Sequence, residues 1–282
     1  MKLVSTLFIL LFCSTFATYG QSLPTEPSFA QSDNAQIAYW VMGEGEPLLL
    51  VHGFLGRATS WSNYLDALSK EHQLILVELR GHGFSTNDKD YYSNHDAAGD
   101  LVAVIDDIGL KTVDAVGFSA GSMALLNMAI MYPERVNSIA VIGGFIKTTE
   151  KASALFQSFH PDKVNPAVHE IVIESHERGE IQAMALLGHL QDFAQNTEPE
   201  FTLDQLASIN ARTLVITGDR DLVIPIEQSI ELYRNIPDAY LMVSPNTGHS
   251  ISPADEKGRE FLLSTLLAFF SNSWQCPAFC DQ

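Results

Sequence analysis

Short apolar runs recur along the chain, and each is bounded by turn-forming or charged residues. They lack the strict alternation of apolar and polar residues that marks a strand with one face in water. They are therefore typical of strands covered on both faces, as in a parallel sheet. The runs are residues 48–51 (LLLV), 74–79 (LILVEL), 113–118 (VDAVGF), 139–142 (IAVI), 214–217 (LVIT) and 240–243 (YLMV). Residues 37–42 indicate an earlier, antiparallel strand.

Helical patterns fill the stretches between these runs. Gly109 suits the end of one helix and Pro133 follows the end of another. The expected helices are residues 61–69, 97–108, 120–131, 226–234 and 256–270. Strands that alternate with helices predict an α/β fold, with a mostly parallel sheet flanked by helices.

The segment 145–205 breaks the alternation, because it carries no strand pattern. Its apolar residues Ala183, Leu186, Leu190 and Phe193 are spaced as on one face of a helix. We expect a helical cap inserted after the strand that ends near Gly143. The alternative is an ordinary pair of core helices. The cap divides the core domain into residues 21–144 and 206–272.

Both ends of the chain carry signals of export. Residues 1–20 combine one lysine, an apolar run and small residues, which is the pattern of a secretory signal peptide. An uncleaved membrane anchor is the alternative. We expect a periplasmic or extracellular protein with no stable membrane insertion after cleavage. In the tail 273–282, Cys276 and Cys280 are expected to form a disulfide, as is usual for cysteine pairs in exported chains.

Composition and charge limit the class of partner. The chain has 282 residues, of which 46% are hydrophobic, enough for one large domain or two small ones with a sizeable core. The formal net charge at pH 7 is −18. A surface this acidic repels phosphate backbones and argues against nucleic acid as a partner. We interpret the excess charge as a contribution to solubility.

Ser119 lies between Gly117 and Gly121, after a predicted strand and before a predicted helix. This strand–turn–helix is the context in which G-x-S-x-G presents a nucleophilic serine at the carboxyl end of a sheet. A serine hydroxyl needs a general base, and the base needs an orienting acid. His249 and Asp221 follow later strands and are the candidates, with Asp219 as the alternative acid.

A developing oxyanion needs hydrogen-bond donors beside the nucleophile. The run LLLV leads into His52, Gly53 and Phe54. A glycine there lets the loop approach a substrate closely. The backbone N–H groups of Phe54 and Ala120 are the candidate donors, and each such donor typically lowers the barrier by about 3 kcal/mol.

Five motifs in this order resemble the α/β-hydrolase superfamily over residues 37–270: HGF (52–54), RGHGFS (80–85), GFSAG (117–121), GDRDLVIP (218–225) and TGH (247–249). The resemblance implies Ser119 as nucleophile, His249 as base and Asp221 as acid, with a cap after the strand that ends near Gly143. A serine at the nucleophile position argues against haloalkane dehalogenases and epoxide hydrolases. The HGF loop differs from the HGGG of some lipases and esterases.

Apolar residues in the predicted cap are candidates for a substrate pocket. They either line an acyl pocket or only pack the cap onto the core. The candidates are Phe156, Phe159, Met184 and Leu187, with His52 beside the oxyanion loop.

The cap also holds His160, His169, His176 and His189, which we expect at the surface rather than around a metal ion. No metal and no cofactor is expected.

These features predict an exported serine hydrolase that cleaves small carboxylic esters through an acyl-enzyme. The same triad serves C–C bond hydrolases, lactonases, amidases and perhydrolases, which remain alternatives. An alternative of another class is a receptor-like protein of this fold that binds a ligand with little turnover.

Overall fold

The computed structural model of the chain describes residues 23–195, 200–251, 253, 255–271 and 274. The predicted signal peptide (1–20) and the predicted disulfide between Cys276 and Cys280 lie outside the described residues. Within the described part, no helix is both long enough and apolar enough to cross a membrane.

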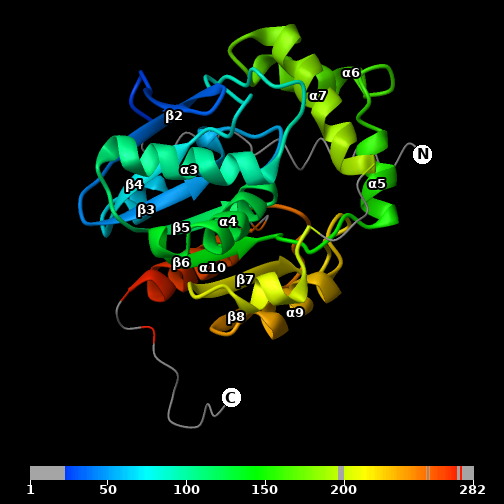
Figure 1. The fold of residues 1–282 in the computed structure, drawn as a ribbon. Coiled ribbons are helices and arrows are strands. Elements are labelled where there is room, and N and C mark those ends of the chain that lie inside the picture. The colour runs from blue at the N-terminus through cyan, green and yellow to red at the C-terminus, as the bar shows by residue number, and fades with distance from the viewer. Residues whose placement is uncertain (1–22, 196–199, 252, 254, 272–273, 275–282) are drawn as a thin grey trace.

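One mixed sheet of eight strands forms the centre of the described part (Figure 1). Its spatial order is β1-β2-β4-β3-β5-β6-β7-β8. The strands are β1 (Ser28–Ser32), β2 (Ala35–Met42), β3 (Glu46–Val51), β4 (His72–Val77), β5 (Val113–Phe118), β6 (Val136–Ile142), β7 (Arg212–Gly218) and β8 (Ala239–Ser244). From β3 to β8 all neighbours are parallel, whereas β2 pairs antiparallel with both β1 and β4. This confirms the predicted fold class.

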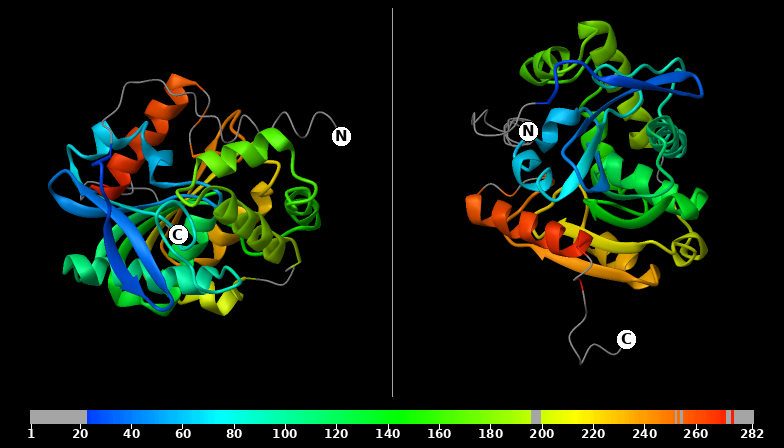
Figure 2. Two further views of the ribbon diagram at one scale, coloured as in Figure 1. Left: turned by 90° about the horizontal axis from the view of Figure 1, so that it is seen from above. Right: turned by 90° about the vertical axis from the view of Figure 1, so that its left-hand side faces the viewer.

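Side chains of the central strands alternate between two apolar layers, one on each face of the sheet. On β3, Leu49 and Val51 pack into the layer under α3, α4 and α9, while Leu48 and Leu50 pack into the layer under α2 and α10. The two layers of helices are seen on opposite sides of the sheet in Figure 2. These helices are α2 (Leu65–Leu68), α3 (Asn94–Ile108), α4 (Ala120–Met131), α9 (Ile226–Asn235) and α10 (Glu256–Phe270).

Two elements differ from the sequence prediction. The predicted helix 61–69 is instead a 3-10 turn, η1 (Ala58–Trp61), followed by the single turn α2. The Tyr64 N–H donates to the Trp61 carbonyl in a tight turn, so the two pieces do not merge. No apolar run predicted the edge strand β1, because only Ala30 of its five residues is buried. A second 3-10 turn, η2 (Pro133–Arg135), links α4 to β6.

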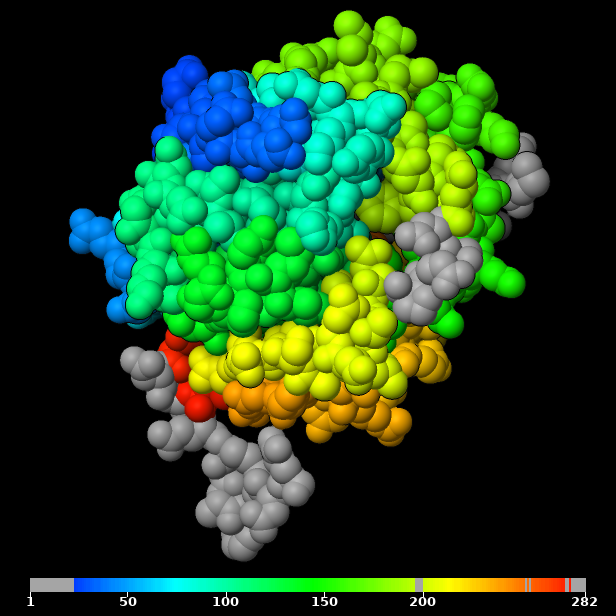
Figure 3. All heavy atoms as spheres, viewed as in Figure 1, coloured from blue at the N-terminus to red at the C-terminus, as the bar shows by residue number. Residues whose placement is uncertain are grey.

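A group of helices between β6 and β7 lies over the carboxyl ends of the parallel strands (Figure 1). It consists of α5 (Glu150–Gln157), α6 (Pro166–Glu174) and α7 (Gly179–Gln195). Their apolar faces share a separate cluster with Leu55 from a loop of the core. Figure 3 shows this yellow-green segment resting on the cyan and teal loops of the core. The next helix, α8 (Leu203–Ala207), begins inside the predicted cap range, but its Leu206 packs in the core layer.

Candidate active site

Ser119 occupies the tight turn between β5 and α4. Its φ of 51° and ψ of −114° lie outside the regions that L-residues favour, so the turn holds it under strain. A Cβ on Gly117 would lie 2.6 Å from the Gly121 carbonyl carbon, and a Cβ on Gly121 would lie 2.5 Å from the Val51 oxygen. Both glycines of the motif are therefore required by close backbone contact.

A continuous hydrogen-bonded chain joins the serine to its predicted partners. Ser119 Oγ lies 3.0 Å from His249 Nε2, and His249 Nδ1 lies 2.8 Å from Asp221 Oδ2. The second carboxylate oxygen of Asp221 accepts the N–H groups of Val223 and Ile224, each at 2.8 Å. The Nδ1–H of His249 donates to the carboxylate, which leaves Nε2 free to accept the serine proton.

The two candidate acids are separated by their contacts. The side chain of Asp221 is 2% exposed and faces His249. Asp219 is 37% exposed and accepts the Thr247 N–H instead. The structure thus brings Asp221, and not Asp219, to the histidine.

Space and packing position the imidazole of His249. Gly143 has φ +63°, and a Cβ there would lie 3.0 Å from His249 Cε1, so glycine leaves room for the ring. Phe118, the residue before Ser119, packs against the same ring with centroids 4.9 Å apart. Sequence reasoning missed Phe118, because the motif leaves that position open.

The two predicted oxyanion donors come from segments that touch. Ala120 is the first residue of α4, so its N–H has no acceptor within the helix, and the helix dipole points toward that end. Phe54 lies in a turn closed by the Gly56 N–H bond to the Gly53 carbonyl at 2.9 Å. The start of α4 packs directly on this loop, since a Cβ on Gly121 would lie 2.6 Å from the His52 oxygen.

His52 does not line a pocket, contrary to the sequence prediction. The side chain is fully buried. Its Nδ1–H donates to the Gly53 carbonyl at 2.7 Å, and its Nε2 accepts the Leu79 N–H at 3.1 Å. Because His52 has no exposed surface and both ring nitrogens are hydrogen-bonded, it supports the oxyanion loop (residues 52–55) from the interior of the protein.

His82 supports the same loop from the RGHG turn. Its Nε2 accepts the Leu55 N–H at 3.0 Å, and its Nδ1–H donates to the Arg80 carbonyl at 3.0 Å. Leu55 has φ +61°, so this bond stabilises a strained residue directly after Phe54. The Phe54 and His82 rings meet edge to face, with centroids 4.7 Å apart.

His176 docks the cap onto the RGHG turn, so its predicted surface position is wrong. The side chain is 4% exposed, because the turn between α6 and α7 lies against the core. His176 Nδ1 accepts the Gly83 N–H at 3.1 Å, and its ring packs on His82 with centroids 5.6 Å apart. Gln182 donates to the Gly81 and Gly83 carbonyls beside it.

Burial shifts the pKa values of this cluster in two directions. Desolvation lowers the pKa of His52 and of His176 to about 3, and lowers the pKa of His82 well below its ordinary value. Desolvation raises the pKa of Glu78, which accepts the Phe84 N–H, to about 7. The charged groups that face the cluster are Arg57, Arg178 and Glu177.

These shifts predict that the protein loses stability in mild acid. Between pH 6.5 and pH 3 the three histidines are protonated in the unfolded chain but stay neutral in the folded protein. The free energy of unfolding therefore falls as pH falls. Glu78 has the opposite effect between pH 7 and 4.5, because its carboxyl binds a proton in the folded protein before it does so in the unfolded chain. The free energy of unfolding should fall by roughly 2 kcal/mol from pH 6 to pH 5. Urea unfolding at each pH measures it.

The variant His176→Gln tests whether the histidines cause this pH dependence, because the glutamine side-chain oxygen can also accept the Gly83 N–H. This variant should reduce the pH slope by about 1.4 kcal/mol per pH unit. An unchanged slope would contradict the assignment to the histidine cluster.

The four apolar pocket candidates lie in different surroundings. Phe159 and Leu187 are buried inside the cap cluster, and Met184 is 39% exposed on the outer side of α7. Phe156 is half-buried and packs against both the core and the cap. Of the four, Phe156 alone lies at the boundary between cap and core.

Two aromatic residues beside Phe54 were not identified from the sequence. The ring centroids of Tyr92 and Phe193 lie 4.9 Å and 5.3 Å from that of Phe54. Phe156 approaches Phe193 at 6.4 Å. The helical spacing on α7 indicated that Phe193 packs inward, but not against which partner.

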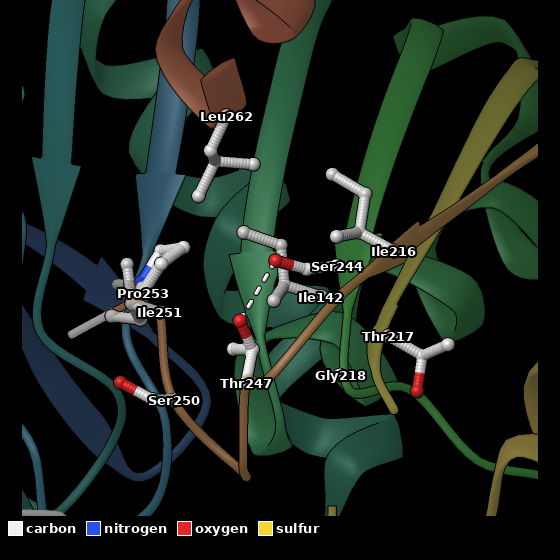
Figure 4. Close-up of a pocket in the computed structure, with 10 residues that line it drawn as sticks. All are labelled: Ile142, Ile216, Thr217, Gly218, Ser244, Thr247, Ser250, Ile251, Pro253 and Leu262. Atoms are coloured by element: carbon white, nitrogen blue, oxygen red, sulfur yellow. Dashed lines mark hydrogen bonds between the residues drawn. The ribbon is translucent and has the colours of Figure 1, made fainter. Parts of the chain in front are cut away.

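A small cavity lies behind the loop that carries His249 (Figure 4). Its volume of about 10 Å³ is close to the space of one water molecule. Ser244 and Thr247, which line it, share a hydrogen bond of 2.8 Å. The cavity is too small for a substrate, and its walls hold the histidine loop against β7 and β8.

Comparisons with known proteins agree with this geometry. Residues 46–165 match the family model for the alpha/beta hydrolase fold. The 2-hydroxy-6-oxononadienedioate/2-hydroxy-6-oxononatrienedioate hydrolase of Burkholderia vietnamiensis is 29% identical over 232 residues, 72% of this chain and 81% of its own. The pyrrolizixenacetamide deacetylase of Xenorhabdus hominickii is 26% identical over 272 residues, 86% of this chain and 97% of its own.

Among solved structures, a meta-cleavage product hydrolase from Pseudomonas fluorescens aligns with a TM-score of 0.69 at 20% identity. The alignment covers 86% of this chain and 97% of that one. The sheet order, the strained serine turn, the family match and these relatives lead to one conclusion: the protein is a hydrolase with the α/β-hydrolase fold.

Proposed function

We propose that the protein hydrolyses a small carbonyl substrate through an acyl-enzyme, with Ser119 as nucleophile. The unbroken chain of hydrogen bonds from Ser119 through His249 to Asp221 carries this proposal. His249 takes the proton as Ser119 Oγ attacks the carbonyl carbon, and Asp221 stabilises the imidazolium. The N–H groups of Phe54 and Ala120 bind the oxyanion.

The second half of the reaction uses the same groups in reverse. His249 donates its proton to the leaving group as the tetrahedral intermediate collapses. Water then attacks the acyl-enzyme, with His249 as base, and the acid leaves Ser119. Every step is a proton transfer or an acyl transfer that these side chains can supply.

The first candidate for the scissile bond is a C–C bond beside a ketone. The relative from Burkholderia vietnamiensis is named for 2-hydroxy-6-oxo dienedioate substrates, and this supports C–C hydrolysis over the ester reaction expected from the sequence. In such a substrate the electron pair of the broken bond passes into the conjugated system, and the carbon takes up a proton. The triad and the oxyanion donors are the same as for an ester.

A carboxylic ester is the second candidate, because two arginines near this edge of the sheet, Arg57 and Arg80, are already paired with carboxylates. Arg80 is bonded to Asp100 at 2.7 Å and 2.8 Å. Arg57 lies between Glu78 and Glu177, at 3.7 Å and 3.2 Å. Neither is free to bind a substrate carboxylate, which favours a neutral substrate.

Initial rates on matched substrate sets test the proposal. One set holds 2-hydroxy-6-oxo dienoates and the other p-nitrophenyl esters from acetate to palmitate, each with wild type and Ser119→Ala. We expect faster turnover of the dienoates, dependent on Ser119. Ester turnover alone would establish the second candidate. Tight ligand binding without turnover on either set would reject both and support the receptor-like alternative.

A further inference from the structure

His82 lies in the RGHG turn between two glycines that both have positive φ. The φ angle is +78° at Gly81 and +47° at Gly83. Glycine adopts this conformation at little cost, but it adopts many others as readily. A histidine between two such residues has little conformational preference of its own, so contacts from neighbouring elements are needed to hold its ring in one place.

The cap supplies three hydrogen bonds to these two glycines. Gln182 on α7 is 2% exposed, and its side-chain amide donates to the Gly81 carbonyl at 2.7 Å and to the Gly83 carbonyl at 2.9 Å. His176, in the turn between α6 and α7, accepts the Gly83 N–H at 3.1 Å and packs its ring on that of His82. Residues of the cap therefore fix the peptides on both sides of His82.

The His82 ring in turn holds the peptide that follows Phe54. Its Nε2 accepts the Leu55 N–H at 3.0 Å, and Leu55 has a φ of +61°, which is unfavourable for a leucine. The pKa of His82 lies well below its ordinary value because the ring is buried. The ring is therefore neutral, and Nε2 remains an acceptor.

The peptide that precedes Phe54 is fixed by other contacts. Its carbonyl, that of Gly53, accepts the His52 Nδ1–H at 2.7 Å and the Gly56 N–H at 2.9 Å. The carbonyl and the N–H of a trans peptide point in opposite directions, so these bonds also set the direction of the Phe54 N–H. The orientation of this candidate oxyanion donor thus depends on His52 on one side and on His82 on the other.

We propose that His82 is a positioning residue for the oxyanion donor Phe54, and that Gln182 and His176 of the cap hold His82 in place. The cap is then part of the geometry that stabilises the oxyanion. Gln182 acts on the glycines, the glycines on His82, and His82 on the loop. The proposal rests on the proposed function, because that function assigns the Phe54 N–H to the oxyanion.

Two substitutions of His82 test its role. His82→Leu removes the acceptor for the Leu55 N–H, whereas His82→Gln keeps an acceptor. We expect His82→Leu to lower kcat by roughly 10- to 100-fold, which is less than the loss on removing an oxyanion donor outright. KM should stay within about twofold, because the oxyanion exists only in the transition state. His82→Gln should recover most of the lost rate.

Gln182→Met tests the contribution of the cap. It removes both hydrogen bonds to the glycines and should lower kcat by roughly 3- to 10-fold, again without a change in KM. Combined with His82→Leu, it should add little to the loss from His82→Leu alone, because both changes act through the same residue. His160→Leu is the matched control, since the His160 side chain is 42% exposed on the cap. It should keep the wild-type rate.

Rates are taken per active site, by titration with a fluorophosphonate, on whichever substrate wild type turns over. Thermal unfolding of each variant separates positioning from loss of fold. A rise in KM that accounts for the whole loss in kcat/KM would overturn the proposal. Equal losses in His82→Leu and His82→Gln, or losses that multiply in the double variant, would also overturn it.

Hydrogen exchange over residues 52–57, measured by mass spectrometry, tests the same contacts without any turnover. Exchange should be faster in His82→Leu and Gln182→Met than in wild type and His160→Leu. Unchanged exchange would overturn the proposal whatever the activity. A wild type that neither turns over a carbonyl substrate nor reacts with the fluorophosphonate would reject the proposed function, while faster exchange in the two variants would still show that the cap holds the loop through His82.

Discussion

Ser119→Ala should lower kcat by roughly 10⁴-fold or more while the protein stays folded. The loss is large because Ser119 Oγ is the only group that His249 Nε2 contacts at 3.0 Å among the described residues. The fold should survive, because the turn is held by backbone contacts and by Ser122. The hydroxyl of Ser122 lies 2.7 Å from the Gly117 carbonyl and 2.9 Å from the Ile142 carbonyl.

The measurement is the initial rate on whichever substrate wild type turns over, with thermal unfolding of both proteins. Ser264→Ala is the matched control, since Ser264 lies on the exposed side of α10 and bonds only to its own helix. It should keep the wild-type rate. Retention of more than a tenth of the wild-type rate by a folded Ser119→Ala protein would remove Ser119 from the mechanism.

The sequence predicted the elements whose causes are local. Apolar runs predicted β3 to β7, because strands covered on both faces favour apolar side chains at most positions. The run YLMV also predicted β8, although this edge strand is only partly covered and Val243 is 39% exposed. The bounds of α4 were predicted at both ends, since the Ser119 turn begins it and Pro133 follows it closely. The edge strand β1 was missed, because a strand with one buried residue leaves almost no pattern.

The triad could be predicted because its members follow strands whose carboxyl ends meet at one edge of the sheet. The choice of Asp221 over Asp219 rested on motif spacing, and the hydrogen bond to His249 agrees with it. The surroundings of the triad could not be predicted in the same way. Phe118 contacts His249 across 131 positions of the chain, and no local pattern reports such a contact.

The histidines illustrate the same limit. His176 was expected at the surface, because the four cap histidines show no metal-binding spacing. Its burial depends on how the α6–α7 turn docks onto Gly83, 93 positions earlier. His52 was considered for a pocket on position alone, and only its two ring contacts show that it faces inward. Docking between distant loops decides the role of each histidine.

Arg80→Met should destabilise the fold by about 3–5 kcal/mol, the cost of breaking a buried ion pair. Arg80 is 1% exposed and bonds both oxygens of Asp100, at 2.7 Å and 2.8 Å, and the Asp100 side chain is 3% exposed. Without the guanidinium, Asp100 is left charged and unpaired in the interior. Domains are stable by only about 5–15 kcal/mol, so urea unfolding at pH 7 should show a large drop in the midpoint.

Two further measurements separate the unpaired charge from lost packing. Adding Asp100→Leu to Arg80→Met removes that charge and should restore at least half of the lost stability. Burial already raises the pKa of Asp100, and removing Arg80 should raise it further. A carboxyl whose folded pKa lies above its unfolded pKa stabilises the fold as pH falls, so the gap between Arg80→Met and wild type should shrink toward pH 4. A gap that is constant with pH, with no recovery in the double variant, would show instead that Arg80 stabilises the fold through the packing of its side chain.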